Sequence, residues 1–307
     1  MTRYLPVLLL CACASSDVEP LRADDAAPLE PRPAVRGTVQ ESGQPRRFVD
    51  THDHYAHAVG KVDAAKFDYL KKAKDGAPAV ALTFDCAWVP EDRGLAVLDA
   101  LREKGVKATF FISGPFVLAA GRPGVNDATQ RVVRRIVEEG HEVGNHTKTH
   151  PHATPQVDWG AELSALVVGW DAAVARAFAG ASVPANAKML PYWRAPFGEY
   201  DARALGQATA QGFPYHFGWN VDARDALGYP SCKDAPQDGT CMTADKQTRW
   251  VLRFADANPT LDAFVVLAHL GGPYGWGSDP KGIRALVDGL RARGRTPVRL
   301  SEIAPDL

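Results

Sequence analysis

From Ala79 onward, short apolar runs alternate with longer amphipathic stretches, and this alternation restricts the fold more than any other feature of the chain. The apolar runs predict strands at 79–84, 108–112, 142–144, 215–219 and 263–267. Helical periodicity is found between them, at 95–104, 129–139, 159–179, 202–210 and 281–293. Strands that alternate with helices pair in parallel, and the helices cover the sheet.

Glycines mark the ends of four of these helical stretches. A helix C-terminal cap is expected at each of them, namely Gly105, Gly140, Gly212 and Gly294. The number of strand–helix units, about six to eight, favours a barrel over an open sheet. We therefore predict an α/β fold, a distorted (β/α) barrel of about seven strands, as a single catalytic domain over residues 79–307.

In such barrels the chemistry collects where the strands end. Five polar residues end or follow an apolar run: Asp85, His146, Arg194, Asp222 and His269. We therefore expect them to share one site.

The segment before this domain has the features of an export signal. Residues 1–13 contain Arg3 and a short apolar run at 5–10, much shorter than the roughly 20 residues that cross a membrane. Leu10-Cys11-Ala12-Cys13 resembles a bacterial lipoprotein cleavage box, in which Cys13 becomes the lipidated residue. An ordinary cleaved signal is the alternative. Both place the mature protein outside the cytoplasm, in the periplasm or cell envelope, and the first anchors it to the membrane.

Two further segments precede the domain. Residues 14–47 are rich in Ala, Pro and charged residues without apolar periodicity, which predicts a flexible tether. Residues 48–78 form an extension that packs on or precedes the domain, and its His52–His57 cluster of His and Asp is either a metal site or an ordinary polar segment.

Net charge and cysteine content limit the partners and the compartment. A net charge of −1 provides no field that attracts nucleic acid, so none is expected as a partner. Beyond the signal, the cysteines are Cys86, Cys232 and Cys241. The last two lie in one Pro/Asp/Gly-rich loop, where a disulfide closes a short ring in an oxidising compartment, and Cys86 is left without a partner.

The segment His146-Thr147-Lys148-Thr149-His150 places two imidazoles four residues apart, so both can bind one divalent cation. Asp85, directly after an apolar run, is a metal ligand, a general base, or a cap of the following helix. Each assignment depends on which of the other polar residues lie nearby.

Arg194 and His269 also allow two interpretations each. Arg194 precedes Pro196 in extended chain, where its guanidinium either orients a carboxylate bidentately or forms a structural ion pair. His269 ends an apolar strand and is either a core residue or a general acid whose tautomer and raised pKa are set by Asp225.

Taken together, the ordered segments resemble the carbohydrate esterase family 4 polysaccharide deacetylases, also called the NodB-homology domain. Thr83-Phe84-Asp85 matches the start of the family motif Thr-Phe-Asp-Asp, and Cys86 replaces its last residue. His146–His150 matches His-[Ser/Thr]-x-x-His, and Arg194–Phe197 matches Arg-x-Pro-[Phe/Tyr]. Leu267–His269 matches Leu-x-His, whereas Asp225 is followed by Ala226 where the family usually has Trp.

The resemblance implies a role for each matched residue. Asp85 is the catalytic base and Arg194 orients it, while His146 and His150 bind a divalent metal, most often zinc. Asp225 tunes His269, the catalytic acid. Leu267 faces the acetyl methyl, and a metal-bound water attacks the N-acetyl carbonyl.

Aromatic residues near these motifs are candidate sugar-stacking faces, although most are expected in the core: Trp88, Tyr192, Trp193, Phe197 and Trp219. The substrate-binding set that we predict is Leu267, Pro196, Phe197 and Trp219.

Cys86 decides between two versions of this site. A cysteine thiolate is a good zinc ligand, which makes a Cys86-His146-His150 site chemically sensible. Alternatively, Cys86 is a packed thiol and the metal is held weakly or lost.

The predicted function is a metal-dependent hydrolase that removes N-acetyl groups from a cell-wall or extracellular polysaccharide. One alternative is a non-catalytic glycan-binding relative that has lost its metal site at Cys86. Another is a deacetylase or esterase that acts on a non-sugar substrate, which the missing Trp after Asp225 leaves open.

Overall fold

The computed structural model describes residues 48–49, 70–87, 89–117, 125–225, 243–271, 276 and 279–304. The chain divides into residues 1–34 and 35–307, and all the described residues lie in the second unit. The predicted signal peptide, residues 1–13, and the predicted tether, 14–47, lie outside the described residues.

The described residues contain a sheet of nine strand segments, and every pairing within it is parallel. In spatial order, β1, β6, β5, β4, β3, β2, β8 and β7 follow one another, and β9 pairs with the first residues of β2. Their bounds are Phe48–Val49 (β1), Ala79–Cys86 (β2), Thr109–Ile112 (β3), Glu142–Asn145 (β4), Tyr192–Trp193 (β5), Tyr215–Phe217 (β6), Val221–Asp222 (β7), Ala263–His269 (β8) and Thr296–Val298 (β9).

Strand β2 is central to the sheet because all eight of its residues are buried. Its side chains alternate between two layers, as the pleat of a strand requires. Val80, Leu82 and Phe84 pack into the large core beneath the helices, whereas Ala79 and Ala81 pack into a smaller core on the other face. The second face also carries the polar residues of the strand.

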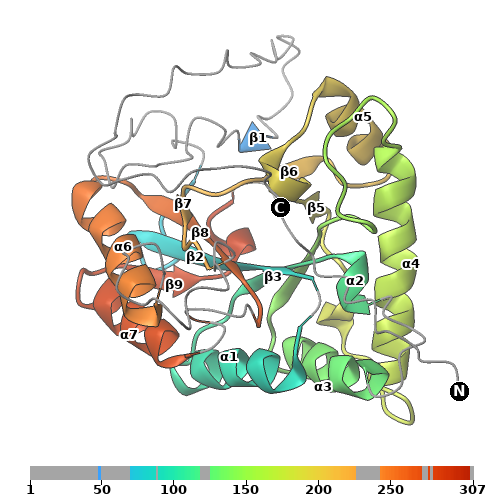
Figure 1. Ribbon diagram of the computed structural model, residues 1–307. Coiled ribbons are helices and arrows are strands. Elements are labelled where there is room, and N and C mark those ends of the chain that lie inside the picture. Colours follow the sequence, from blue (N-terminus) through green and yellow to red (C-terminus); the bar gives the residue numbers. More distant parts are fainter. Residues whose placement is uncertain are drawn as a thin grey trace, which may run out of the picture. The chain divides into compact units, whose positions relative to one another are not determined.

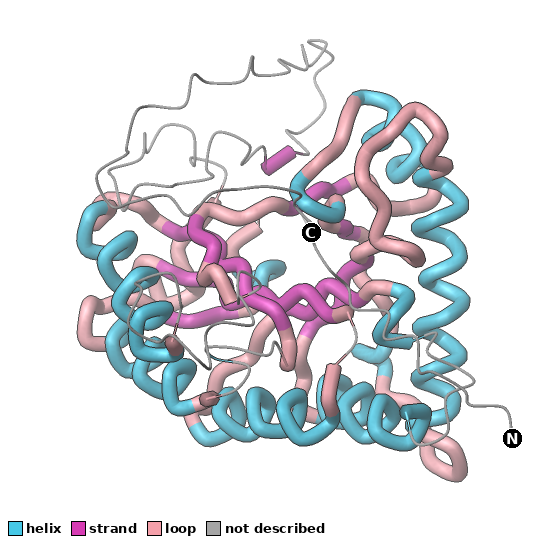
Figure 2. The backbone as a smooth tube through the Cα atoms, viewed as in Figure 1, coloured by secondary structure: helices cyan, strands magenta, loops and turns pink. Residues whose placement is uncertain are grey.

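Helices cover the outer face of the sheet (Figures 1 and 2). They are α1 (Glu91–Glu103), α2 (Gly114–Val117), α3 (Val125–Glu138), α4 (Trp159–Ala177), α5 (Ala202–Ala210), α6 (Ala244–Ala257) and α7 (Lys281–Arg291), with short 3₁₀ turns at Ala185–Ala187, Pro196–Gly198 and Leu300–Glu302. Polar side chains cap three helices by accepting a backbone N–H in the first turn: Asp158 for α4, Asp201 for α5 and Thr243 for α6.

The predicted α/β class and distorted (β/α) barrel are confirmed. Each of the five predicted strands and five predicted helices corresponds to an observed element, and Gly105, Gly140, Gly212 and Gly294 all adopt positive φ. The prediction did not include β1, β5, β7 and β9, which have only two or three residues, or helices α2 and α6. Within the part of the chain that the structure describes, no helix has the length and apolar character needed to cross a membrane.

Candidate active site

The C-terminal ends of the parallel strands bring the predicted polar residues to one edge of the sheet. Asp85, the second-last residue of β2, and His269, the last residue of β8, are direct partners in the register. His146 follows β4 and Arg194 follows β5. Asp225 lies three residues after the end of β7, on the far side of β8.

Asp85 is held by a guanidinium that has almost no freedom to move. Arg194 is fully buried, and its Nη1 donates to Asp85 Oδ1 at 2.7 Å. Its Nε donates to the carbonyl of Phe217, and its Nη2 to Thr83 Oγ1 and the carbonyl of Gly218, each at 2.9 Å. These bonds fix the fork geometry of the pair.

The charges around Asp85 keep it ionised. Burial alone would raise the pKa of this carboxyl, but the guanidinium of Arg194, followed by smaller effects of His146 and His269, holds the pKa below its ordinary value. Asp85 is therefore a carboxylate at neutral pH, and its Oδ1 is already hydrogen bonded to Arg194.

His146 is fixed in one tautomer. Its Nδ1 lies 2.9 Å from the carbonyl oxygen of Arg194, which can only accept, so Nδ1 carries the proton. Burial lowers the pKa of His146, which favours the neutral ring with a lone pair on Nε2. That Nε2 lies 3.3 Å from Asp85 Oδ2. Two acceptors at this distance repel unless a proton or a cation lies near both.

The ring of His150 lies beside that of His146, and the backbone of the loop between them is unusual. Thr147 and His150 adopt positive φ, 68° and 56°, although neither is glycine. The ring of His150 packs edge-on against His146 at a centroid distance of 4.8 Å and against Phe197 at 4.6 Å. Burial, then the neighbouring His146, lowers the pKa of His150 to about 3, so this imidazole is neutral.

Two neighbours hold the loop that carries these histidines. Glu162 on α4 accepts from both the backbone N–H and the hydroxyl of Thr149. Gly114 donates its N–H to the carbonyl of Thr147 and approaches the loop so closely that a Cβ there would meet the carbonyl oxygen of Lys148 at 1.8 Å. Only glycine fits at residue 114 without a backbone shift.

His269 forms a second pair with Asp225. His269 Nδ1 lies 2.7 Å from Asp225 Oδ1, and the backbone N–H of His269 donates to Oδ2 at 2.6 Å. Asp225 is fully buried, whereas the His269 side chain is 32% exposed and so remains accessible to a substrate. Burial lowers the pKa of His269, but the charge and hydrogen bond of Asp225 outweigh it and raise that pKa to about 9.

The structure does not bring Cys86 to the histidine pair. The thiol is fully buried in the large core beneath the helices and donates to the carbonyl of Phe84 at 3.5 Å. Burial, and then the charge of Asp85, raises the pKa of Cys86 well above its usual value, so it stays a neutral thiol. The predicted Cys86 ligand is therefore corrected: β2 remains regular through residue 86, and consecutive side chains of a strand face opposite sides.

The predicted substrate-binding residues occupy different environments. Leu267 and Trp219 are almost fully buried in the smaller core, with the Trp219 ring 5.6 Å from the Arg194 guanidinium carbon. Pro196 is buried and Phe197 is half-buried beside His150. Tyr192 and Trp193 are fully buried, as expected for core aromatics.

Several predicted features lie outside the described residues: Trp88, the predicted lipidation residue Cys13, the predicted disulfide between Cys232 and Cys241, and the His52–His57 cluster.

A family model described as polysaccharide deacetylase matches residues 72–216, a range that contains Asp85, both loop histidines and Arg194. Over this range the chain resembles the polysaccharide deacetylase family. The sequence resemblance to these deacetylases is therefore confirmed.

Curated relatives of this deacetylase family include a chitooligosaccharide deacetylase of Sinorhizobium fredii, which is 35% identical over 52% of this chain and 66% of its own length. A peptidoglycan-N-acetylglucosamine deacetylase of Listeria monocytogenes is 39% identical over 30% of this chain and 18% of its own length. The chain spans 66%, 57% and 59% of three chitooligosaccharide deacetylases that it matches.

Solved structures of the family share the fold. The chitin deacetylase of Colletotrichum lindemuthianum superposes with a TM-score of 0.55 at 22% identity, over 78% of this chain and 92% of that one. A family 4 pseudoenzyme of Bacillus anthracis superposes with a TM-score of 0.54 at 20% identity, over 75% and 66% of the two chains.

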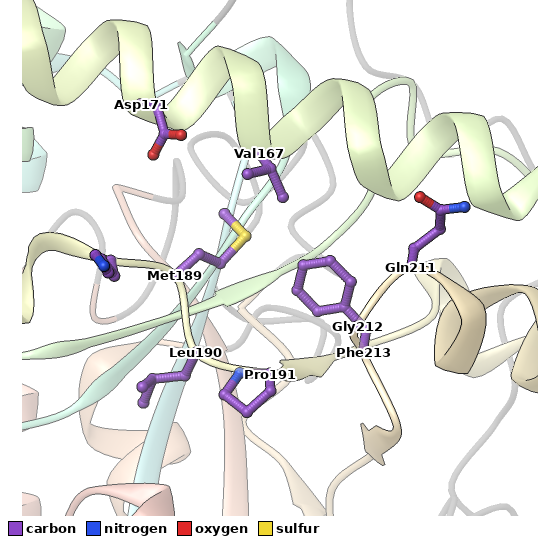
Figure 3. A pocket seen from close by; sticks show the side chains of 9 residues that line it. Val167, Asp171, Met189, Leu190, Pro191, Gln211, Gly212 and Phe213 are labelled. Atoms are coloured by element: carbon purple, nitrogen blue, oxygen red, sulfur yellow. The ribbon is translucent and has the colours of Figure 1, made fainter.

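A cavity of about 340 Å³ lies away from these residues. Figure 3 shows it between helix α4, which contributes Val167 and Asp171, and the segments that lead into β5 and β6, which contribute Pro191 and Phe213. None of the candidate acid, base or imidazole residues lines it.

Sequence reasoning missed residues that shape the site without contacting a substrate. Asn145 accepts the N–H of Thr147 and donates to the carbonyl of Leu163, which anchors the histidine loop to α4. The polar Asn145 directly before His146 was the available signal. Thr83, two residues before Asp85 on the same face of β2, offered a similar one through strand periodicity.

Proposed function

We propose that this chain is a hydrolase that removes N-acetyl groups from an N-acetylated glycan. The observation that carries the proposal is the pairing of Asp85 and His269 on adjacent strands, with pKa values shifted in opposite directions. An ionised carboxylate and a protonated imidazole at neutral pH are the base and acid that amide hydrolysis needs.

The residues present fit a divalent cation in part. His146 Nε2 and the neutral ring of His150 are suited to bind one, because imidazole binds metal through an unprotonated nitrogen. The facing acceptors His146 Nε2 and Asp85 Oδ2 also favour positive charge between them. However, no three His, Cys, Asp or Glu side chains gather in metal-binding geometry among the described residues. When bound, a cation such as zinc would polarise the acetyl carbonyl oxygen.

Two residues of the chain then carry out the two proton transfers, Asp85 as the base and His269 as the acid. Asp85, oriented by Arg194, accepts the proton of the attacking water as that water adds to the acetyl carbonyl carbon. His269 donates its Nε2 proton to the amine nitrogen as the carbon–nitrogen bond breaks. Asp225 holds Nδ1 and stabilises the imidazolium before the transfer.

The glycan class follows from the relatives. Relatives that match part of the chain are named as deacetylases of chitooligosaccharides and of peptidoglycan N-acetylglucosamine, and both substrates carry the same acetamide. We further propose that the protein is exported and anchored to the cell envelope through Cys13, which would place it beside such glycans.

The test is acetate release from N-acetylglucosamine oligomers and from peptidoglycan, with the metal content of each preparation measured. Asp85→Asn and His269→Ala should each lower turnover by about 10² to 10⁴-fold while the fold is kept. Asp171→Asn, an exposed position on α4, is the matched control and should behave as wild type. If Asp85→Asn and His269→Ala both turn over substrate as fast as the wild type, the acid–base assignment is wrong.

The position of Cys86 favours a second candidate, a glycan-binding protein without catalysis, because the family's usual third ligand is replaced by a core thiol. Oligomer binding without acetate release by the wild type, in the presence of added zinc, would establish that alternative. Faster turnover of acetyl esters than of N-acetyl sugars would instead indicate a non-sugar substrate.

A further inference from the structure

The chain that follows β7 makes a tight turn closed by a side chain. Asp222, the last residue of β7, accepts the backbone N–H of Arg224 through its Oδ1 at 2.7 Å. Arg224 adopts φ of 61°, in the left-handed region that a non-glycine residue rarely enters. An aspartate that bonds the N–H two residues ahead is the local interaction that stabilises such a turn.

The turn places Asp225 in contact with His269. Directly after Arg224, both carboxylate oxygens of Asp225 accept from His269, one from the backbone N–H and one from Nδ1. Two simultaneous bonds of 2.6 and 2.7 Å require one orientation of the Asp225 side chain. The backbone at Arg224 sets that orientation, and the Asp222 bond holds that backbone.

The charged groups that face His269 come from the ends of two strands, β7 and β2. Asp225 follows β7, Asp85 is the second-last residue of β2, and Asp222 ends β7, and each carries negative charge toward the imidazole. Asp225 acts through its charge and a hydrogen bond, whereas Asp222 acts on His269 only through charge at longer range. The geometric role of Asp222 and its weak electrostatic role can therefore be separated by substitution.

We propose that Asp222 is a positioning residue for the reaction, because its carboxylate closes the turn that aims Asp225 at His269. The inference rests on the proposed function insofar as His269 is the acid. It predicts that the hydrogen-bond acceptor at residue 222 matters more than the charge.

Three variants test this. Asp222→Asn keeps an oxygen acceptor and removes the charge, and Asp222→Ala removes both. In the double variant Asp222→Ala/Arg224→Gly, glycine adopts the positive φ without help from residue 222. Asp75→Ala is the matched control, because Asp75 makes the same bond to the N–H two residues ahead, at 2.9 Å, away from the site.

Two readouts are followed in the full-length protein: the titration of the His269 imidazole by NMR, which needs no activity, and acetate release. Asp222→Ala should lower the His269 pKa by about one unit and reduce kcat by about 10-fold with little change in KM. Asp222→Asn should change the His269 pKa and kcat much less. The double variant Asp222→Ala/Arg224→Gly should recover most of the pKa and kcat lost in Asp222→Ala. Asp75→Ala should change neither.

Equal losses in Asp222→Asn and Asp222→Ala, or no rescue by Arg224→Gly, would overturn the positioning role and assign the effect to charge. An unchanged His269 pKa and kcat in Asp222→Ala would also overturn the positioning role. If the expected NMR shifts appear but the wild type releases no acetate, the proposed function fails while the positioning role stands.

Discussion

At the scale of single residues, Asp85 and His269 differ in the charges that surround them. Asp85 is paired with the Arg194 guanidinium and stays ionised, whereas His269 is flanked by carboxylates and holds its proton. Because the two residues are register partners near the ends of neighbouring strands, these opposite environments lie side by side. The contrast is what gives each residue a separate role.

The raised pKa of His269 predicts the pH dependence. Its folded-state value of about 9 lies above the ordinary 6.5, so the stabilising interaction with Asp225 is complete below pH 6.5 and is lost as pH rises through about 9. Turnover should fall over the same alkaline range as the acid loses its proton. Asp225→Asn should move that alkaline limb toward 6.5 and lower the thermal stability at pH 7 but not at pH 10. An alkaline limb that does not move would contradict the role of Asp225.

The second residue-scale prediction concerns Cys86. Because its thiol packs in the core, Cys86→Val should leave zinc affinity and turnover within about 2-fold of wild type, since the swap stays apolar and enlarges the side chain by only about one methyl group. Cys86→Asp should lower the free energy of unfolding by several kcal/mol, because it buries an unpaired charge. Zinc titration and denaturant unfolding measure the two effects. Loss of zinc binding in Cys86→Val would show that the thiol is a ligand after all.

At the scale of elements, the histidine loop depends on its contact with α2. Gly114→Ala places a Cβ against the Lys148 carbonyl, so the loop must move. The variant should be destabilised by about 1–3 kcal/mol and should bind zinc at least about 10-fold more weakly, because the two imidazoles no longer converge. Zinc titration and thermal unfolding are the measurements.

The matched control is Gly206→Ala in the exposed middle of α5, where no atom lies within 4 Å of the new Cβ. It should raise stability by up to about 1 kcal/mol, because alanine is the better helix former, and leave zinc affinity unchanged. Equal zinc affinities in the two variants would mean that the loop does not need the close approach at Gly114.

At the scale of the whole molecule, strand–helix alternation was sufficient to predict the barrel, because the long strands and helices carry clear periodicity. Segments as short as β5 and β7 could not be predicted, since two residues have no period. The edge that carries Asp85, Arg194 and His269 could be predicted, because parallel strands end together. The packed position of Cys86 could also be predicted, because Val80, Leu82, Phe84 and Cys86 share one parity, opposite to Thr83 and Asp85.

Other parts of the site depend on contacts that periodicity does not encode. The neutral state of His150 arises from burial against His146, which is a tertiary contact. The turn at Arg224 depends on a positive φ in a residue type that seldom adopts it. Nothing in the sequence around Arg224 distinguishes this turn from an ordinary loop.

The register between β2 and β8 places Asp85, the proposed base, beside His269, the proposed acid, although one belongs to the first long strand of the domain and the other to the last. Such a contact closes a long loop, and loop closure of this kind is the slow part of folding a parallel barrel. Helices and neighbouring strand pairs such as β3 with β4 can form earlier from local contacts. A partly folded or partly synthesised chain therefore has secondary structure but no active site, and chemistry begins only when the two ends of the domain have met.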